Sequence, residues 1–333
     1  MDALKGIKVI ELEGLAPVPF CGQILADFGA DVTAIKKKKS GSLKAKFSRN
    51  KRSISLDYKD DIHHIRDLVD RADVLLDPYK PGVLEAIGLA PLELWKTNPG
   101  LIVARITGYG QTGSMAKKGG HDLNYVSLSG ILPFISGKNE RPWPPANVLA
   151  DFAGGGLNGA FGILAAIIKR NRTGEGAVVD VSMTEGVSYL GAMLFEYQGN
   201  EVMWNKDFGL FRGDCPIYRT YQTKDDKFMA VGALEPKFHQ AVFKTLDVDP
   251  NLIDNPTELT NVLEAKFKSK TRNEWASIFE KVDACVTPVL DLEEVKDSEL
   301  HKSRNNFRPD ESLSQPSPRI YSSQELKKLP AKL

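Results

Sequence analysis

Alternation between strand and helix patterns at the start of the chain is the feature that most restricts its fold. Lys8–Leu12 is an apolar run typical of a strand, Phe20–Phe28 repeats its apolar residues at helical spacing, and Asp31–Ile35 is a second strand candidate. A strand, a helix and a second strand in this order are the sequence form of a parallel sheet. We therefore predict an α/β fold whose large domain is a doubly wound parallel sheet.

Further strand candidates continue this pattern at Ser53–Leu56, Val74–Leu76, Leu101–Ile106 and Val178–Ser182. The pattern changes at Tyr218, where two short strand candidates flank a polar turn and indicate a hairpin. The sequence thus predicts two domains joined by an irregular segment. We expect a large domain over 1–190, a linker over 191–217, a smaller α+β domain over 218–297, and a tail over 298–333 that returns toward the large domain.

Composition excludes several classes of protein. The formal net charge of the 333 residues is +1, so no global signature of nucleic-acid or membrane binding exists. The three cysteines are far apart, and no Cys/His cluster has metal-ligand spacing, so we expect a reducing compartment and no metal. No single apolar run is long enough to predict a membrane span, because Leu157–Ile168 stops at Lys169. Gly14-Leu15-Ala16-Pro17 follows the first strand in place of a dinucleotide-binding glycine motif, which disfavours NAD.

Candidate chemistry is concentrated between Gly119 and Gly156. His121 follows Gly119-Gly120, and Asp151 shortly precedes Gly154-Gly155-Gly156, so both lie beside glycines where a backbone can approach a ligand closely. A His and an Asp on opposite sides of one carbon form a two-base device, in which one group removes a proton and the other returns it. The alternatives are that Asp151 only caps the apolar helix that follows and that His121 is structural.

A basic run follows the second strand candidate, at the edge where open α/β sheets bind ligands. Its nine Lys and Arg residues suit a polyphosphate such as that of CoA, although a charge run is also the ordinary form of a solvated surface. The residues are Lys36, Lys37, Lys38, Lys39, Lys44, Lys46, Arg49, Lys51 and Arg52. A Gly-rich turn, Thr107–Gly113, follows the strand candidate Leu101–Ile106 and is expected at the same edge.

The segment Gly120-His121-Asp122-Leu123-Asn124-Tyr125, with Ala150-Asp151-Phe152-Ala153-Gly154, closely resembles the racemases of CoA-transferase family III, and the likeness runs from Leu4 to about Pro318. The resemblance implies His121 and Asp151 as the two acid–base groups. It implies that Asp122 supports the site and that Glu235 hydrogen-bonds the His121 imidazole. Binding of CoA is implied for Lys37, Lys51, Arg52, Gly120 and Tyr125. Relatives usually have an acid followed by Arg-Pro where this chain has Lys36–Lys39.

Three functions follow as hypotheses. The first is a racemase that interconverts R and S 2-methyl-branched acyl-CoA thioesters through an enolate, with CoA as part of the substrate and no other cofactor. The second is a CoA-transferase in which Asp151 is the nucleophile, and the third is a non-catalytic acyl-CoA-binding protein. The resemblance also implies an interlocked homodimer. Ala331-Lys332-Leu333 is similar to a peroxisomal address, so we expect a peroxisomal or mitochondrial protein, otherwise a cytoplasmic one.

Overall fold

A computed structural model describes residues 2–38, 47–135, 141–205, 208–308 and 318–326. Lys39, Lys44 and Lys46 of the basic run lie outside these residues, as does Ala331-Lys332-Leu333. The chain divides into two compact units. The first consists of described residues within 1–133, 143–192 and 312–333, and the second of those within 134–142 and 193–311.

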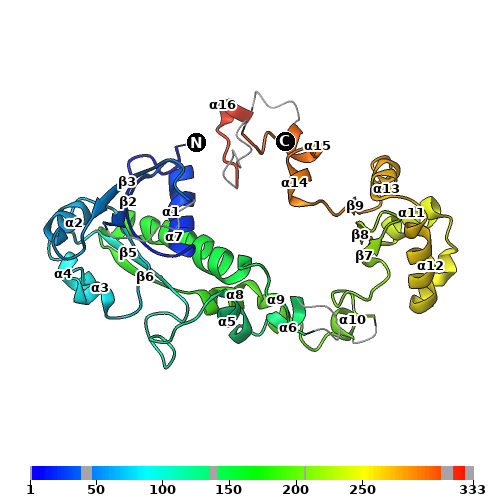
Figure 1. The fold of residues 1–333 in the computed structure, drawn as a ribbon, viewed down its shortest axis with the longest axis horizontal. Coiled ribbons are helices and arrows are strands. Elements are labelled where there is room, and N and C mark those ends of the chain that lie inside the picture. Colours follow the sequence, from blue (N-terminus) through cyan, green and yellow to red (C-terminus); the bar gives the residue numbers. More distant parts are fainter. Residues whose placement is uncertain (1, 39–46, 136–140, 206–207, 309–317, 327–333) are drawn as a thin grey trace. The chain divides into compact units, whose positions relative to one another are not determined.

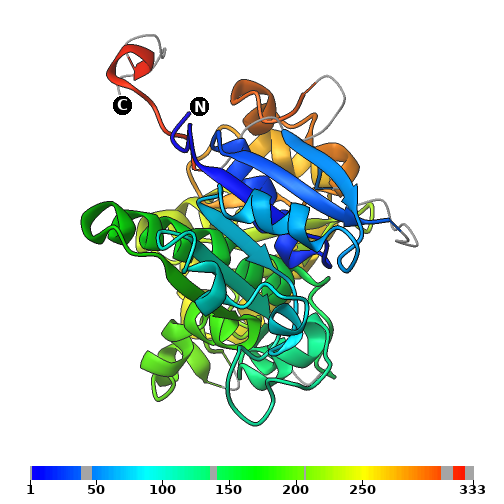
Figure 2. The same cartoon turned by 90° about the vertical axis from the view of Figure 1, so that its left-hand side faces the viewer.

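The first unit is built on a six-stranded parallel sheet of order β3-β2-β1-β4-β5-β6, whose twist is visible in Figure 2. Apart from β3, which is rich in polar residues, the strands are rich in β-branched and aliphatic residues, and β4 and β5 are buried along their whole length. The strands are β1 (Lys8–Leu12), β2 (Asp31–Lys37), β3 (Lys51–Leu56), β4 (Val74–Asp77), β5 (Ile102–Thr107) and β6 (Ala177–Ser182). The predicted α/β class and parallel sheet are confirmed.

Helices cover both faces of this sheet. Figure 1 shows α1 (Pro17–Asp27) and α7 (Asn158–Thr173) on one side. On the other side, side chains from α2 (Ile62–Val69), α3 (Val83–Ala86) and α4 (Pro91–Leu94) join strand residues in a buried apolar cluster. The remaining helices of this unit are α5 (Asp122–Leu128), α8 (Met183–Leu190) and α16 (Ser323–Leu326), and α6 (Leu132–Ile135) crosses into the second unit.

One helix differs from its prediction. A π-helix, η1 (Val148–Leu157), runs directly into α7, so the apolar helix that was expected to begin at Leu157 starts nine residues earlier and contains Asp151. η1 and α7 form one continuous helix, Val148–Thr173. Among the described residues, it is the one helix that is long and apolar enough to cross a membrane. That length is weak evidence for a span, since core helices pass the same test. The prediction that no apolar stretch reaches this length was wrong, because η1 extends the apolar helix α7 at its N-terminal end.

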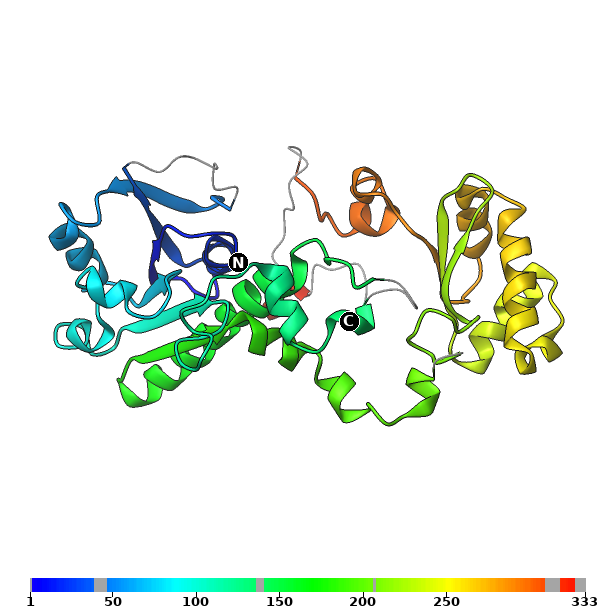
Figure 3. The ribbon, with the colours of Figure 1, turned by 60° about the horizontal axis from the view of Figure 1, so that its bottom comes forward.

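The second unit contains a three-stranded antiparallel sheet of order β7-β8-β9. The predicted hairpin is present as β7 (Tyr218–Gln222) and β8 (Phe228–Gly232), and β9 (Val286–Pro288) pairs with β8. Figure 3 shows helices beside this sheet. Those that bury a core of aromatic and aliphatic side chains against it are α11 (Pro236–Leu246), α12 (Pro256–Lys268) and α13 (Arg272–Phe279). The other helices of this unit are α9 (Ala192–Glu196), whose first residue belongs to the first unit, α10 (Glu201–Trp204), η2 (Pro250–Asp254), α14 (Leu292–Val295) and α15 (Glu299–Ser303).

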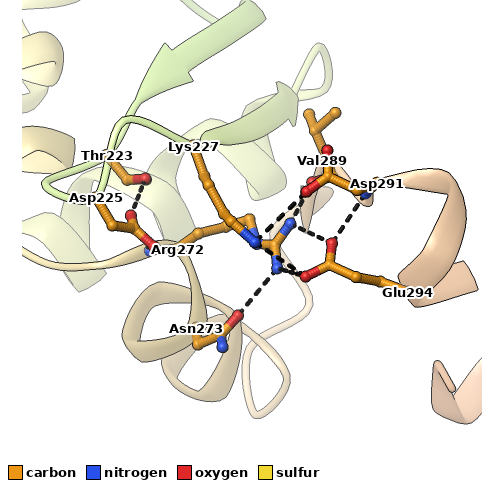
Figure 4. A network of polar contacts seen from close by, with 8 residues as sticks. All are labelled: Thr223, Asp225, Lys227, Arg272, Asn273, Val289, Asp291 and Glu294. Carbon is orange, nitrogen blue, oxygen red and sulfur yellow. Dashed lines mark hydrogen bonds and ion pairs between the residues drawn. The ribbon is translucent and has the colours of Figure 1, made fainter.

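A buried guanidinium fixes the way the chain leaves this sheet (Figure 4). Arg272 donates to both carboxylate oxygens of Glu294, at 2.6 and 2.7 Å, and to the carbonyl of Val289 at 2.8 Å. Lys227 adds a second cation 3.0 Å from the same carboxylate. These contacts hold the pKa of Glu294 well below its ordinary value. The network therefore links α13 and α14 to the residue that precedes β8.

Candidate active site

A cavity opens at the carboxyl edge of the parallel sheet, where the strand order reverses between β1 and β4. Open α/β sheets bind their ligands at this position. The cavity has a volume of about 290 Å³ and is lined by Gly14 after β1, Pro78 after β4 and Gly108 after β5. A Cβ on Gly14 would lie 2.3 Å from the Cβ of Pro78, so only glycine lets the two loops approach. The Gly-rich turn expected at the end of β5 is therefore part of the cavity wall.

Tyr125 closes one side of this cavity. Its hydroxyl donates to the carbonyl of Gly120, and its ring occupies the space that a side chain on Gly108 or Gly120 would need. The ring also packs edge-on against Tyr109, with 5.1 Å between centroids. Burial raises the pKa of Tyr125 to about 12, so the phenol is neutral at physiological pH. Tyr125 thus fixes the loop that carries His121, and both Gly120 and Tyr125 line the cavity.

His121 is the residue before the first turn of α5. Its backbone N–H donates to the side-chain oxygen of Asn124 at 3.1 Å, which fixes the start of the helix. Its side chain is exposed, unlike a histidine that only fills a core. The local sequence accounts for this placement, because Gly119-Gly120 ends the preceding loop and Asn124 supplies the reciprocal cap.

Asp122 and Asp151 connect α5 to η1. The carboxylate of Asp122, which is 1 % exposed, accepts the N–H of Ala150 at 2.8 Å and that of Asp151 at 2.9 Å. Asp151 is half-buried, and its pKa is raised to about 6, chiefly by burial and then by the charge of Asp122, with His121 acting in the opposite direction. The structure therefore brings His121, Asp122 and Asp151 within electrostatic reach of one another.

The π-helix holds Asp151 against the body of the unit. Gly154 and Gly186 face each other so closely that a Cβ on Gly186 would lie 2.3 Å from the carbonyl oxygen of Gly154. On the opposite side, a Cβ on Gly156 would lie 2.9 Å from the carbonyl oxygen of Pro17. The run of three glycines thus lets η1 pack directly on α8 and α1. Widened π turns are rare and are often found at functional sites.

The basic residues predicted to bind CoA occupy two different edges of the sheet. Lys37 ends β2 at the carboxyl edge, with its ammonium 5.2 Å from the ring centroid of Tyr58 and 5.0 Å from that of Tyr79. Lys51 and Arg52 instead begin β3, opposite Val32 and Thr33 at the amino end of β2. The expectation that all nine lie at the carboxyl edge was wrong, because a parallel strand must start from the opposite edge.

Lys51 and Arg52, at the amino edge of the sheet, each form an ion pair with an acidic residue. The ammonium of Lys51 is buried and lies 2.7 Å from a carboxylate oxygen of Glu11, while it also donates to the carbonyl of Pro19. Arg52 forms an exposed pair with Asp31. The main effect of the Lys51 ammonium in this structure is therefore to hold β3 against α1, which contains Pro19. A role of Lys51 and Arg52 in binding CoA stays a prediction.

Glu235 lies in the second unit, immediately before α11, where Pro236 begins the helix. Its side chain does not cap this helix. The hydrogen bond to His121 that the resemblance implies stays a prediction.

Sequence reasoning missed two cations of the cavity, Lys80 and Lys118. Lys80 follows the end of β4 by three residues, and Lys118 directly precedes Gly119-Gly120. Two features of the sequence could have identified these lysines: Lys80 lies shortly after a predicted strand, and Lys118 lies directly before the His121 motif. Among the described residues, no group of three or more His, Cys, Asp or Glu side chains is arranged to hold a metal ion.

Comparison with known proteins identifies the group to which this arrangement belongs. The model of CoA-transferase family III matches residues 4–319. The chain belongs to this family. A CaiB/baiF CoA-transferase family protein from Caenorhabditis elegans is 54 % identical over 99 % of this chain and 98 % of its own length. Alpha-methylacyl-CoA racemase from Homo sapiens is 44 % identical over 92 % of this chain and 82 % of its own.

A solved structure shows the same fold. The crystal structure of a CAIB/BAIF family protein from Brucella suis superposes with a TM-score of 0.82 at 24 % identity, covering 97 % of this chain and 93 % of that one. Family III membership makes the protein an enzyme that handles acyl-CoA. Its candidate active site is the cavity that Gly120 and Tyr125 line, together with His121 and Asp151, which are not themselves among the lining residues.

Proposed function

We propose that the protein is a racemase that interconverts the R and S forms of 2-methyl-branched acyl-CoA thioesters. The observation that carries the proposal is the pairing of two acid–base groups of different environment at one site. His121 is exposed, and Asp151 is half-buried with its pKa raised to about 6. A pKa near the operating pH lets one group serve as base in one direction and as acid in the other, as a reversible proton transfer requires.

The enolate between the two transfers needs a hydrogen-bond donor for its oxygen. The backbone at the start of α5 is the candidate source, because the first N–H groups of a helix have no partner within it. The N–H of His121 is donated to Asn124. The N–H of Asp122, the next residue, is therefore the donor that we propose for the thioester oxygen.

The cavity suits the CoA part of the substrate. Lys80 and Lys118 line it, and Lys37 lies at the same edge of the sheet, so three cations are available to phosphate oxygens. Pro17, Val18 and Ile106 provide apolar wall beside them. The 44 % identity to an alpha-methylacyl-CoA racemase supports this substrate class. Side chains and backbone groups alone carry the proposed reaction.

A CoA-transferase is the second candidate, because the family includes such enzymes by its own description. In that reaction the Asp151 carboxylate would attack the thioester and form an anhydride. A raised pKa works against this role at low pH, since a protonated carboxyl is a poor nucleophile. A transferase also leaves His121 without a necessary function.

Exchange of the α-proton separates these possibilities. A 2-methylacyl-CoA incubated with the protein in D₂O should take up deuterium at the α-carbon and lose its optical purity. His121→Ala and Asp151→Asn should each lower racemisation by roughly 10²-fold or more. Asp60→Asn, which removes an exposed carboxylate far from the motif, is the matched control. Transfer of CoA to a free acid without deuterium uptake would identify a transferase, and binding without either reaction would identify a binding protein.

We also propose that the active protein is a homodimer. Four large apolar side chains lie along one face of the η1–α7 helix at spacings of four, three and four residues, so they form a continuous stripe. The residues are Leu157, Phe161, Leu164 and Ile168, with exposed fractions of 49, 69, 38 and 62 %. An apolar stripe of this kind is typical of a protein interface. Because the family resemblance implies a homodimer, we propose that a second copy of this chain covers the stripe.

A further inference from the structure

A single guanidinium joins the two ends of the segment that carries Lys80. Arg105 lies on β5 opposite Asp77, the last residue of β4. Its Nε donates to the Asp77 carboxylate at 2.9 Å, and its Nη1 donates to the carboxylate of Glu85 on α3 at 2.7 Å. Asp77 and Glu85 flank residues 78–84, which we call the Lys80 segment. Arg105 therefore closes this segment into a loop.

Burial gives this network a fixed geometry. Asp77 is 0 % exposed, and Arg105 is 6 % exposed. The other oxygen of Asp77 accepts the N–H of Tyr79 at 2.8 Å, so the start of the Lys80 segment is held as well. A buried ion pair is often no more stabilising than apolar side chains of the same volume. What it adds here is direction, because the planar guanidinium holds two carboxylates at set angles, which an ammonium cannot do.

The Lys80 segment forms part of the cavity wall at the carboxyl edge of the sheet. Pro78, Tyr79 and Lys80 all line the cavity. The Lys80 ammonium would lie 3.8 Å from a Cβ on Gly119, so it lies beside the loop that leads to His121. Within the described part of the chain, this ammonium has no ion-pair partner. The position of the segment thus decides where an unpaired cation lies in the cavity.

We propose that Arg105 is a positioning residue that holds the Lys80 segment so that the Lys80 ammonium meets a phosphate oxygen of CoA. The inference rests on the proposed binding of CoA in this cavity and deepens it. Charge-assisted hydrogen bonds to phosphate depend on distance and angle. A lysine side chain is flexible, so the backbone that carries it must be fixed by other contacts. In the alternative, Arg105 only stabilises the sheet, and it would not affect CoA affinity through Lys80.

A double-mutant cycle tests whether Arg105 acts through Lys80. Isothermal titration calorimetry measures the Kd of CoA for wild type, Arg105→Lys, Lys80→Gln and the double variant. Arg105→Lys keeps the positive charge beside Asp77 and removes the bridge to Glu85. We expect each single change to raise Kd about tenfold, and the double variant to bind no more weakly than Lys80→Gln. Such non-additivity would show that both side chains act on one contact with CoA.

Asp73→Asn is the matched control for a purely structural effect. Asp73 precedes the same strand, β4, at the amino edge of the sheet, and it pairs with Arg170 at 2.8 Å. Loss of this pair should lower the melting temperature and leave the Kd of CoA unchanged. Glu85→Ala replaces Arg105→Lys if circular dichroism shows that the latter does not fold, because the Glu85 side chain is 39 % exposed.

An unchanged Kd in folded Arg105→Lys protein would overturn the proposal. So would an unchanged Kd in Lys80→Gln, a double variant that binds a further tenfold more weakly than Lys80→Gln, or a wild type that does not bind CoA. The racemase function is judged separately, by α-proton exchange. A protein that shows the expected cycle but exchanges no α-proton would keep this role of Arg105 and lose the racemase function.

Discussion

At the scale of single residues, burial decides how Asp151 behaves. A carboxyl that loses water favours its neutral form, and the neighbouring charge of Asp122 acts in the same direction. Because the folded state then holds its proton more tightly than the unfolded chain, Asp151 favours folding at low pH. This contribution is lost as the pH rises from the ordinary value of 3.8 through about 6.

Replacement of this carboxyl should therefore stabilise the protein in one pH range only. We expect Asp151→Asn to increase the free energy of unfolding at pH 8 by on the order of 1–2 kcal/mol, after allowance for the part of the side chain that solvent screens. The difference should disappear at about pH 3 or lower, below the ordinary value of 3.8, where Asp151 of wild type is largely protonated in both states. Denaturant unfolding at the two pH values measures it. An equal difference at both would show that Asp151 is not destabilised by ionisation.

At the scale of elements, close packing of backbone on backbone places the π-helix. Gly154 on η1 and Gly186 on α8 leave no room for a side chain between the two helices. Helices with larger residues at the contact lie 8–10 Å apart, and a small-residue contact is closer. The position of Asp151 thus depends on a residue of α8 that does not line the cavity.

A methyl group at this contact should disturb both stability and activity. Gly186→Ala would place a Cβ 2.3 Å from the carbonyl oxygen of Gly154, which is backbone and cannot turn away. We expect a loss of about 1–3 kcal/mol in the free energy of unfolding, together with lower α-proton exchange because η1 shifts. Gly199→Ala is the matched control, since nothing lies within 4 Å of its Cβ. Wild-type stability in Gly186→Ala would contradict the close contact.

At the scale of the whole molecule, the chain forms two units with separate cores. The acid–base pair and the cavity belong to the first unit, and Glu235 belongs to the second. The packing of the first unit leaves the stripe along η1 and α7 exposed. Association of two copies would remove this apolar surface from water.

A charge in the stripe should prevent that association. Phe161→Glu replaces a side chain that is 69 % exposed in the single chain, so it should fold normally. In a dimer the carboxylate would be buried without a partner, and we expect the association to weaken on the order of a hundredfold. Analytical ultracentrifugation of wild type and variant measures the mass. Leu92→Glu, at a 73 % exposed position of α4, should leave it unchanged. A wild-type monomer with full activity would contradict the dimer.

Local sequence was sufficient to predict the six strands of the parallel sheet and the hairpin, because apolar periodicity reports the faces that a strand or helix buries. The short strand β9 was not predicted. The glycines near His121 and Asp151 made these residues candidates, and the family resemblance gave them their proposed roles, which stay a prediction. The edge of the sheet reached by Lys51 and Arg52, the π-helix and the Asp122 contact were decided by tertiary structure alone. Each depends on a contact with a residue distant in the chain. Lys51 and Arg52 contact Glu11 and Asp31, η1 packs on Gly186, and Asp122 accepts the N–H of Ala150. The sequence indicates which side chains are apolar or need a polar partner, whereas only the folded chain determines which residues they contact.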